Sequence, residues 1–376
     1  MSKPLDRWKL HRLAVDRLRL FSQFPRRSTS KRMLILSERG DICHAQLFPF
    51  FDYSRALRAE CRLSVRELPL SHFMRGSNPY RTDVDVVCLQ TWFDLDETRL
   101  IALISKIKAT WPDGKLVYLD WFAPLDLRYA EALNPHIGAY VKKQTFRELG
   151  QYGVETIGDT NLTDYYCRRY GLNLPTTRFS MPIGFQEKLV LGSGFEYSPT
   201  IKRLVQRPPG MDRRKIDLHA RVVARGAEWY ARMRSEASEK AASLAGRFEI
   251  AHSGRISYSR YIDELRSSKL CFSPFGYGEI CWRDFEAMST GALLLKPDVS
   301  HLRTANELFK PYETYVPLRW DFEDLDEKVA YYAKNDAERT KIARHAYDLV
   351  AGIYQPQKFL NGTRPLLGLL GIANLA

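Results

Sequence analysis

Short apolar runs alternate with longer amphipathic stretches along the first half of the chain. The apolar runs at 33–38, 84–89, 116–119 and 139–142 predict buried strands. The stretches at 44–60, 94–109 and 144–150 predict helices, and Asp94 is placed to cap the second of them. Strands that alternate with helices in this way predict a parallel sheet with helices on both faces.

The same alternation returns after residues 175–213, a segment rich in Pro, Gly, Ser and Arg that we interpret as the interdomain region. Residues 215–223 are expected to open the second domain; strands are predicted at 269–273 and 292–295, and helices at 226–246, 258–268, 322–333 and 336–353. A chain of 376 residues is long enough for two domains of ordinary size. The pattern therefore predicts two α/β domains, each built on a parallel sheet.

The stretch 269–298 predicts a strand, a glycine loop, a helix that ends at Gly291, and a second strand. Gly276 and Gly278 would let backbone N–H groups approach an anion at the start of the helix, where the helix dipole favours negative charge. Arg283 suits a phosphate because its planar fork donates two hydrogen bonds at once. The loop and helix together predict a phosphate site.

Glu279, Arg283 and Glu286 are spaced so that they share one face of this helix if it begins near Glu279. A carboxylate beside the arginine suits the hydroxyl groups of a sugar or a ribose. A surface ion pair and a plain turn would explain fewer of these residues than an anion site at a strand–helix junction does.

At this point the sequence SPFGYGEICWRDFEAMSTGALLLKP resembles the C-terminal, nucleotide-sugar half of GT-B glycosyltransferases. It is similar to the exostosin-like group in its order of Arg283, then Glu286-Ala287, then Gly291. It is also similar to the glycosyltransferase group 1-like enzymes, which retain configuration and have two glutamates with seven residues between them. Here Glu279 and Glu286 have six between them. The specific resemblance covers roughly residues 250–325.

The resemblance implies a GT-B-like α/β fold with two Rossmann-like domains that face each other across a cleft. The expected parts are a basic amphipathic segment at 1–30, an acceptor domain at 31–195, a nucleotide-sugar domain at 196–350 and a tail at 351–376 that packs across the joint. We expect no internal repeats and no low-complexity segment.

The activity implied by the resemblance is transfer of a sugar from a UDP- or GDP-linked donor to a glycan or lipid-linked acceptor, in surface polysaccharide synthesis. The exostosin likeness favours inversion, and the glutamate pair leaves retention open. No cofactor other than the donor and no metal is expected. The predicted donor and nucleotide residues are Arg255, Tyr261, Gly276, Tyr277, Gly278, Glu279, Arg283 and Glu286.

An inverting transfer needs a base that takes the proton of the acceptor hydroxyl. Asp120 follows the 116–119 strand directly and is the first candidate; Asp41 follows the first strand and is the second. Asp126 is a weaker third candidate. Each of these aspartates has capping or loop hydrogen bonding as its alternative role. Three Asp-x-Asp triplets, at 83/85, 94/96 and 324/326, are expected to cap or flank elements rather than to bind metal.

Positive charge is concentrated at the N-terminus. Residues 1–32 contain ten Lys/Arg and two acids and so carry +8 of the net charge of +13. Apolar residues recur at helical spacing from Leu5 to Phe24, which predicts a basic amphipathic helix. Such a helix lies on an anionic membrane surface or packs on its own domain, and the sequence leaves both open.

No apolar run approaches the roughly 18–20 residues that a membrane span needs, and no secretory signal is recognised. The six cysteines form no C-x-x-C pair and are expected to be reduced thiols in a cytoplasmic protein, peripheral on the inner face of the membrane. Nucleic-acid binding is not expected, because no recognised module accompanies the basic segment. The alternative function is a non-catalytic GT-B-fold binding protein that its basic N-terminus holds on an anionic membrane or polymer.

Overall fold

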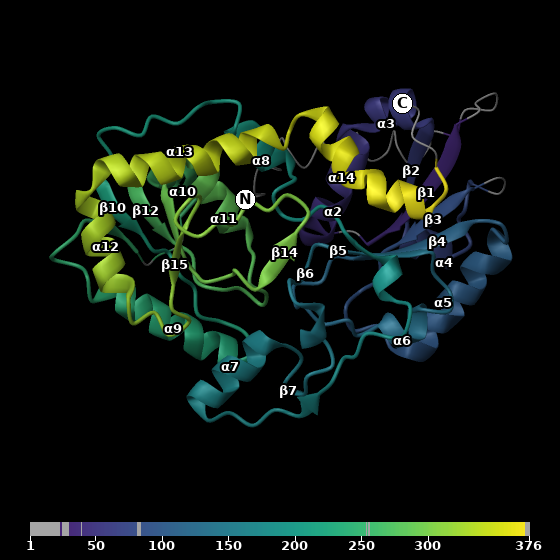
Figure 1. Cartoon of the computed structure of the whole chain (residues 1–376), viewed down its shortest axis with the longest axis horizontal. Coiled ribbons are helices and arrows are strands. Elements are labelled where there is room, and N and C mark those ends of the chain that lie inside the picture. The colour runs from purple at the N-terminus through teal and green to yellow at the C-terminus, as the bar shows by residue number, and fades with distance from the viewer. Residues whose placement is uncertain are drawn as a thin grey trace, which may run out of the picture.

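Two parallel β-sheets, one in each half of the chain, form the framework of the protein (Figure 1). The computed structural model describes residues 23–24, 30–38, 40–80, 84–252, 254 and 256–372. The first sheet has the strand order β2 (Leu63–Pro69), β1 (Lys31–Ser37), β3 (Val86–Leu89), β4 (Lys115–Asp120), β5 (Ala139–Lys142) and β9 (Leu189–Leu191). The second has the order β11 (Ile250–Ala251), β10 (Ile216–His219), β12 (Ser268–Phe272), β13 (Leu293–Pro297) and β15 (Val316–Leu318).

Helices surround both sheets, as the alternating pattern predicts. In the first half these are α2 (Asp41–Asp52), α3 (Ser54–Cys61), α4 (Leu70–Met74), α5 (Glu97–Thr110), α6 (Ala130–Leu133) and α7 (Asn161–Tyr170). In the second half they are α8 (Pro199–Leu204), α9 (Glu228–Ala242), α10 (Tyr258–Ser267), α11 (Trp282–Thr290), α12 (Leu325–Lys334), α13 (Asp336–Gly352) and α14 (Pro356–Leu369). The predicted α/β class is confirmed.

Burial explains why β1 is a central strand. Residues 33–36 are all fully buried, and alternate side chains point to opposite faces of the sheet. Met33 and Ile35 belong to the core cluster that continues under α2 and α3, whereas Leu34 and Leu36 belong to the cluster under α5. A strand that is covered on both faces has a continuous run of apolar residues, and this run is why the strand could be predicted from the sequence.

Three local predictions in the first half were wrong. Residues 144–150 contain the strand β6 (Gln144–Phe146) and a 3-10 turn at Leu149–Gln151 instead of a helix. Asp96, rather than Asp94, caps α5, and its side chain accepts a hydrogen bond from the Arg99 N–H at 2.9 Å. The single helix expected at 44–60 is broken at Tyr53 into two.

Backbone pairing and an apolar contact are among the connections between the halves. β6 pairs antiparallel with β14 (Leu302–Thr304), a strand from the second half. After α13 the chain returns to the first half, where α14 contacts α3 and β5 (Figure 1). Phe359 of α14 packs on Phe50 and Tyr53, with ring centroids 5.4 and 5.2 Å away. The two sheets are therefore held together by backbone pairing and by an apolar contact.

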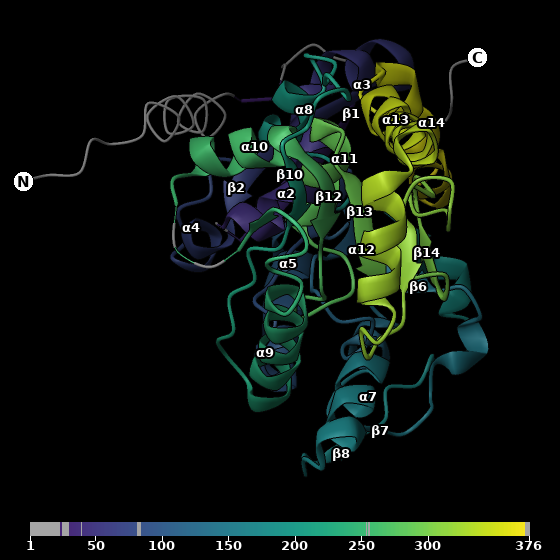
Figure 2. The same ribbon diagram turned by 90° about the vertical axis from the view of Figure 1, so that its left-hand side faces the viewer.

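Two further features lie at the edges of the molecule. α7 and the small antiparallel pair β7 (Thr156–Ile157) and β8 (Thr176–Thr177) project from one end (Figure 2). Nearly all of the basic segment lies outside the described residues, but Phe24 is buried, with its ring centroid 5.4 Å from that of Tyr80. Among the helices of the described residues, none has the length and apolar character needed to cross a membrane.

Candidate active site

The glycine loop between β12 and α11 lies against the first half of the chain. A Cβ added to Gly278 would be 2.2 Å from the carbonyl oxygen of Ala123, in the loop that follows β4. The Gly276 N–H donates to the Gly278 carbonyl at 3.1 Å, so it is already used within the loop. The expectation that this N–H approaches an anion was wrong, and Gly278 is required by a close contact between the two halves.

Tyr277, between these glycines, leans onto the start of α9. Its ring stacks on Tyr230 with a centroid separation of 4.3 Å, and its hydroxyl accepts a hydrogen bond from the Ala227 N–H at 3.0 Å. Nearly half of the Tyr277 side chain remains exposed. The tyrosine therefore fixes the loop and still presents part of its ring to solvent.

α11 begins at Trp282, three residues later than Glu279, so Glu279 lies in the loop and does not share the helix face with Arg283. Cys281 is the N-cap, and its backbone N–H donates to Asp284 at 2.9 Å. The buried Asp284 carboxylate also accepts from the Ser273 hydroxyl at 2.6 Å and lies 3.0 Å from the Lys296 ammonium. This capping network fixes the first turn of the helix that carries Arg283.

Arg283 points from this first turn toward the end of β10. Its Nη2 donates to the Arg221 carbonyl at 2.6 Å, while its buried Nε has no hydrogen-bond partner among the described residues. Burial, with the positive charge of Arg283 as the next cause, lowers the pKa of His219 to about 3, so that imidazole is neutral. Arg283 therefore keeps one buried donor without a partner among the described residues, beside a neutral histidine.

Glu286 lies one turn further along α11. Its two carboxylate oxygens accept hydrogen bonds from the hydroxyls of Tyr258 at 2.9 Å and Tyr261 at 3.0 Å. Burial raises the pKa of Glu286, although these two hydroxyls act in the opposite direction. Because a carboxylate has about four acceptor positions, Glu286 keeps capacity for further hydroxyl groups. Tyr261, a predicted donor residue, thus positions Glu286.

A groove of about 980 Å³ opens beside Glu286. Its walls come from both halves of the chain: Asp41 and His44 belong to α2, and Tyr258 belongs to α10. Three arginines also line it, namely Arg203, Arg207 and Arg266. The volume falls within the range of cavities that hold small-molecule ligands. Of the two candidate bases, Asp41 is the one that reaches this groove, from the exposed first turn of α2.

Asp120 does not fit the role of a base. Its side chain is fully buried and forms an ion pair of 2.7 Å with Lys142, which is also fully buried. Its carboxylate accepts further hydrogen bonds from the Tyr140 hydroxyl at 2.7 Å and from the Phe122 N–H at 2.9 Å. A base must reach the acceptor hydroxyl directly or through one water, and this carboxylate is enclosed by its own partners. The prediction for Asp120 is therefore corrected to a structural role.

The remaining candidates are placed as follows. Asp126 is buried and paired with Arg128, whose Nη2 lies 2.6 Å from its carboxylate. Arg255 lies outside the described residues. Among the described aspartates of the Asp-x-Asp triplets, Asp96 caps α5 and Asp326 pairs with Arg247 at 2.7 Å. Within the described ranges, no group of three or more His, Cys, Asp or Glu could hold a metal ion.

Sequence reasoning missed the residues that connect the donor motif to the first half. Glu279 is buried at the domain junction, where its carboxylate lies 3.5 Å from His301 and accepts a hydrogen bond from the Gln144 amide at 3.3 Å. His301 follows β13 and Gln144 begins β6. His301 could have been suspected from the sequence, because polar residues directly follow the strand at 293–297. No local pattern in the sequence pointed to Gln144.

Comparisons with known proteins concern the second half of the chain and the fold as a whole. Residues 209–360, which include the whole stretch 269–298, match the family model described as glycosyl transferase-like. A search of curated protein sequences finds no match. A solved alpha-glucosyltransferase in complex with UDP is similar over 91% of this chain and 100% of its own, with 9% identity and a TM-score of 0.51.

The chain has the GT-B fold of glycosyltransferases. The predicted GT-B resemblance is thereby confirmed, whereas the exostosin-like assignment stays a prediction. Another alpha-glucosyltransferase structure, in complex with UDP and a 13-mer DNA containing a HMU base, gives the same coverage, identity and TM-score. A sucrose-phosphate synthase from Thermosynechococcus elongatus covers 92% of this chain and 100% of its own at 11% identity, with a TM-score of 0.48.

Proposed function

We propose that this chain is a metal-independent glycosyltransferase that moves a sugar from a UDP- or GDP-linked donor to a glycan or lipid-linked acceptor. The observation that carries the proposal is the pair Arg283 and Glu286 on one helix, inside the segment that matches the glycosyl transferase-like family. The solved alpha-glucosyltransferase whose fold is similar is in complex with UDP.

In the proposed donor complex, the diphosphate lies against the guanidinium of Arg283, whose Nε has no partner among the described residues. Glu286 accepts hydrogen bonds from donor hydroxyl groups, with Tyr258 and Tyr261 holding its carboxylate in place. The fixed cation stabilises the negative charge that develops on the departing nucleotide, a role that a divalent metal plays in other enzymes. Activity is therefore expected to persist in EDTA.

We assign the base for an inverting transfer to Asp41, because it lines the same groove as Glu286 and Asp120 is enclosed. The acceptor hydroxyl loses its proton to Asp41 as its oxygen bonds to the anomeric carbon, and the nucleotide diphosphate leaves with the electrons of the broken bond. Surface polysaccharide synthesis on the cytoplasmic face of a membrane suits the basic segment, which would hold the enzyme near a lipid-linked acceptor.

A thermal-shift series with UDP, GDP and CMP tests the proposal. A ligand that binds the native state stabilises it by mass action, by about 2.7 kcal/mol at a concentration 100 times its Kd. We expect UDP or GDP to raise the melting temperature and CMP to have little effect. The absence of a shift with all three nucleotides would favour a non-catalytic protein held on an anionic surface.

A further inference from the structure

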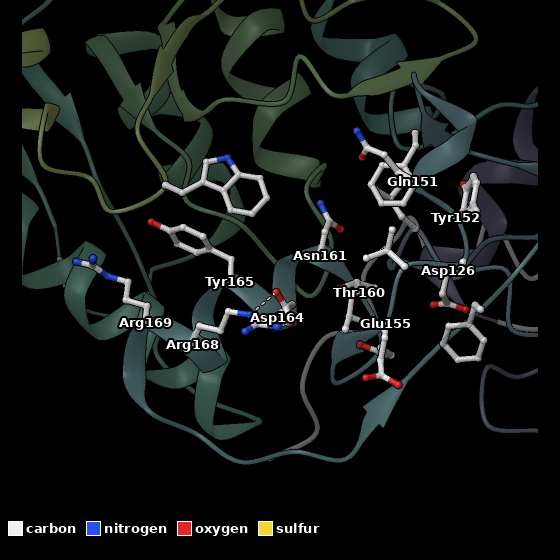
Figure 3. A pocket seen from close by; sticks show the side chains of 18 residues that line it. Asp126, Gln151, Tyr152, Glu155, Thr160, Asn161, Asp164, Tyr165, Arg168 and Arg169 are labelled. Carbon is white, nitrogen blue, oxygen red and sulfur yellow. Dashed lines mark hydrogen bonds and ion pairs between the residues drawn. The ribbon is translucent and has the colours of Figure 1, made fainter.

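A second cavity, of about 920 Å³, lies at the end of the molecule that carries α7. Its walls come from α7, from the segment that follows β6, from the loop after β4, and from Trp320 just beyond β15. Figure 3 shows Asn161, Asp164 and Tyr165 of α7 on one side of the space and Asp126, Gln151 and Tyr152 on the other. Both halves of the chain therefore contribute to this cavity, and neither Arg283 nor Glu286 lines it.

Half-buried aromatic rings form part of its wall. Tyr165 and Trp320 pack edge to face with their centroids 5.1 Å apart, and each side chain remains partly exposed. Trp320 is fixed from behind, because its indole N–H donates to the Asp298 carbonyl at 2.9 Å and its own carbonyl accepts from the Tyr166 hydroxyl at 2.8 Å. Rigid aromatic faces of this kind offer contact area to the C–H faces of a sugar ring.

Polar groups stand beside these rings. The side-chain oxygen of Asn161 is buried and has no hydrogen-bond partner among the described residues, although the residue lines the cavity. An unpaired buried acceptor costs free energy unless a water or ligand donates to it. The Asp159 and Glu155 carboxylates lie in the same wall, the former 3.1 Å from Arg128. Because most of these polar groups are hydrogen-bond acceptors, the lining suits a ligand whose hydroxyl groups donate hydrogen bonds.

The charge of the lining selects against anionic ligands. Four carboxylates line the cavity, from Asp126, Glu155, Asp159 and Asp164, against two arginines, Arg168 and Arg169. Both arginines and three of the carboxylates are paired: Arg168 with Asp164 at 2.8 Å (Figure 3), Arg169 with Glu236, and Asp126 and Asp159 with Arg128, which leaves the group negative overall. Phosphate groups would meet net negative charge here, which disfavours a nucleotide or a nucleic acid and favours a neutral ligand.

The cavity reaches the donor motif through two short contacts. The Asn161 amide nitrogen lies 3.4 Å from Nε2 of His301, and the same His301 nitrogen lies 3.5 Å from the Glu279 carboxylate. His301 also packs on Trp320, with centroids 5.5 Å apart. A ligand in the cavity would therefore lie next to residues that contact the motif loop.

We propose that this cavity binds a neutral oligosaccharide, the glycan part of the acceptor, with Tyr165 and Trp320 as the stacking surface and Asn161 as a hydroxyl-binding group. The inference rests on the proposed glycosyltransferase function and names its acceptor class. The reacting hydroxyl of the acceptor still lies in the groove with the nucleotide, where Asp41 takes its proton, and the cavity under α7 holds the part of the glycan away from that hydroxyl.

Saturation-transfer NMR with maltotriose, mannotriose and chitotriose tests the proposal on the full-length protein. We expect at least one of the three to bind wild-type protein and Tyr165→Phe, which keeps the ring. Tyr165→Ala should weaken that binding by about tenfold, the upper range for one aromatic contact. Tyr331→Ala, which removes an exposed tyrosine on α12, is the matched control and should bind like wild type. Asn161→Ala, which removes the unpaired acceptor, should also weaken binding.

The UDP and GDP thermal shift is measured in parallel on every variant and should not change. If a nucleotide shifts the melting temperature but no trisaccharide binds, the glycan site is wrong and the glycosyltransferase proposal survives. Equal trisaccharide binding by Tyr165→Ala and wild type would also overturn the site. If the wild-type protein binds a 13-mer DNA duplex and Tyr165→Ala does not, the cavity is a nucleic-acid site instead. If no nucleotide shifts the melting temperature of the protein, the proposed function is wrong.

Discussion

At the scale of single residues, a substitution in the Asp120–Lys142 ion pair shows whether Asp120 stabilises the fold or acts as the catalytic base. Both side chains are fully buried, with 2.7 Å between the charged atoms. Removing one partner of a buried pair leaves the other charge uncompensated and typically costs about 3–5 kcal/mol. We expect Asp120→Asn to lower the free energy of unfolding by this order, measured by urea denaturation. A stable Asp120→Asn protein that has lost only transfer would restore Asp120 as the base.

Glu286 and Asp41 belong to different halves of the chain and are expected to fail in different ways. Glu286→Gln should raise the KM for the donor and slow hydrolysis of the sugar nucleotide as well as transfer, because it weakens contacts to donor hydroxyls. Asp41→Asn should bind donor normally and lose transfer by about 100- to 10,000-fold, the usual effect of a missing general base.

Donor KM and the rates of hydrolysis and transfer, measured on both variants, separate these roles. An Asp41→Asn protein with weakened nucleotide affinity and an unchanged turnover number would show that Asp41 contacts the donor and is not the base. Glu279→Gln is a useful companion, since its carboxylate lies at the domain junction rather than beside Glu286.

The residues that were predictable from the sequence are those whose chemistry is gathered in one contiguous stretch. Arg283 and Glu286 could be proposed as site residues because a glycine loop, a helix start and two charged side chains occur within a few positions. The enclosure of Asp120 could not be found, because Lys142 and Tyr140 come from the neighbouring strand of the sheet. Spacing along the chain says that an aspartate ends a strand, but not what surrounds its carboxylate.

At the scale of elements, the two glycines of the loop between β12 and α11 have different roles. Gly278 allows the two halves to approach closely, whereas Gly276 does not. Gly278→Ala would bring its Cβ within 2.2 Å of the Ala123 carbonyl, so the loop or the neighbouring half must move. At Gly276 the nearest atom to an added Cβ is 3.5 Å away, an ordinary contact. We expect Gly278→Ala to lower the melting temperature and the activity, and Gly276→Ala to do so far less. Similar effects of the two substitutions would contradict this reading of the loop.

The elements also show where local patterns are overridden. β1, β4, β5 and α11 were predictable because each is buried or capped in a way that its own residues display. Residues 144–146 form a strand because β14, more than 150 positions later, pairs with them. Such a pairing leaves no local periodicity, and a three-residue strand is too short to show one.

At the scale of the whole molecule, the basic segment sets the expected response to a membrane. Residues 1–32 carry +8, and a basic residue near an anionic surface contributes about 1 kcal/mol of binding. We expect the full chain to bind anionic liposomes in a salt-sensitive manner. A chain that begins at Lys31 should lose this binding and keep its activity on a soluble acceptor. Equal sedimentation of both chains with liposomes would show that the segment packs on its own domain and does not bind the membrane.

The central claim is that Arg283 stabilises the leaving nucleotide, and the turnover of Arg283→Ala tests it most directly. Sugar-nucleotide turnover is measured in EDTA for wild type, Arg283→Ala and the control Arg247→Ala, which removes an exposed ion pair with Asp326. Removing one positioned donor of transition-state charge costs about 100- to 1,000-fold in rate. The account predicts such a loss for a folded Arg283→Ala protein and near wild-type turnover for Arg247→Ala. Near-normal turnover of folded Arg283→Ala would contradict it.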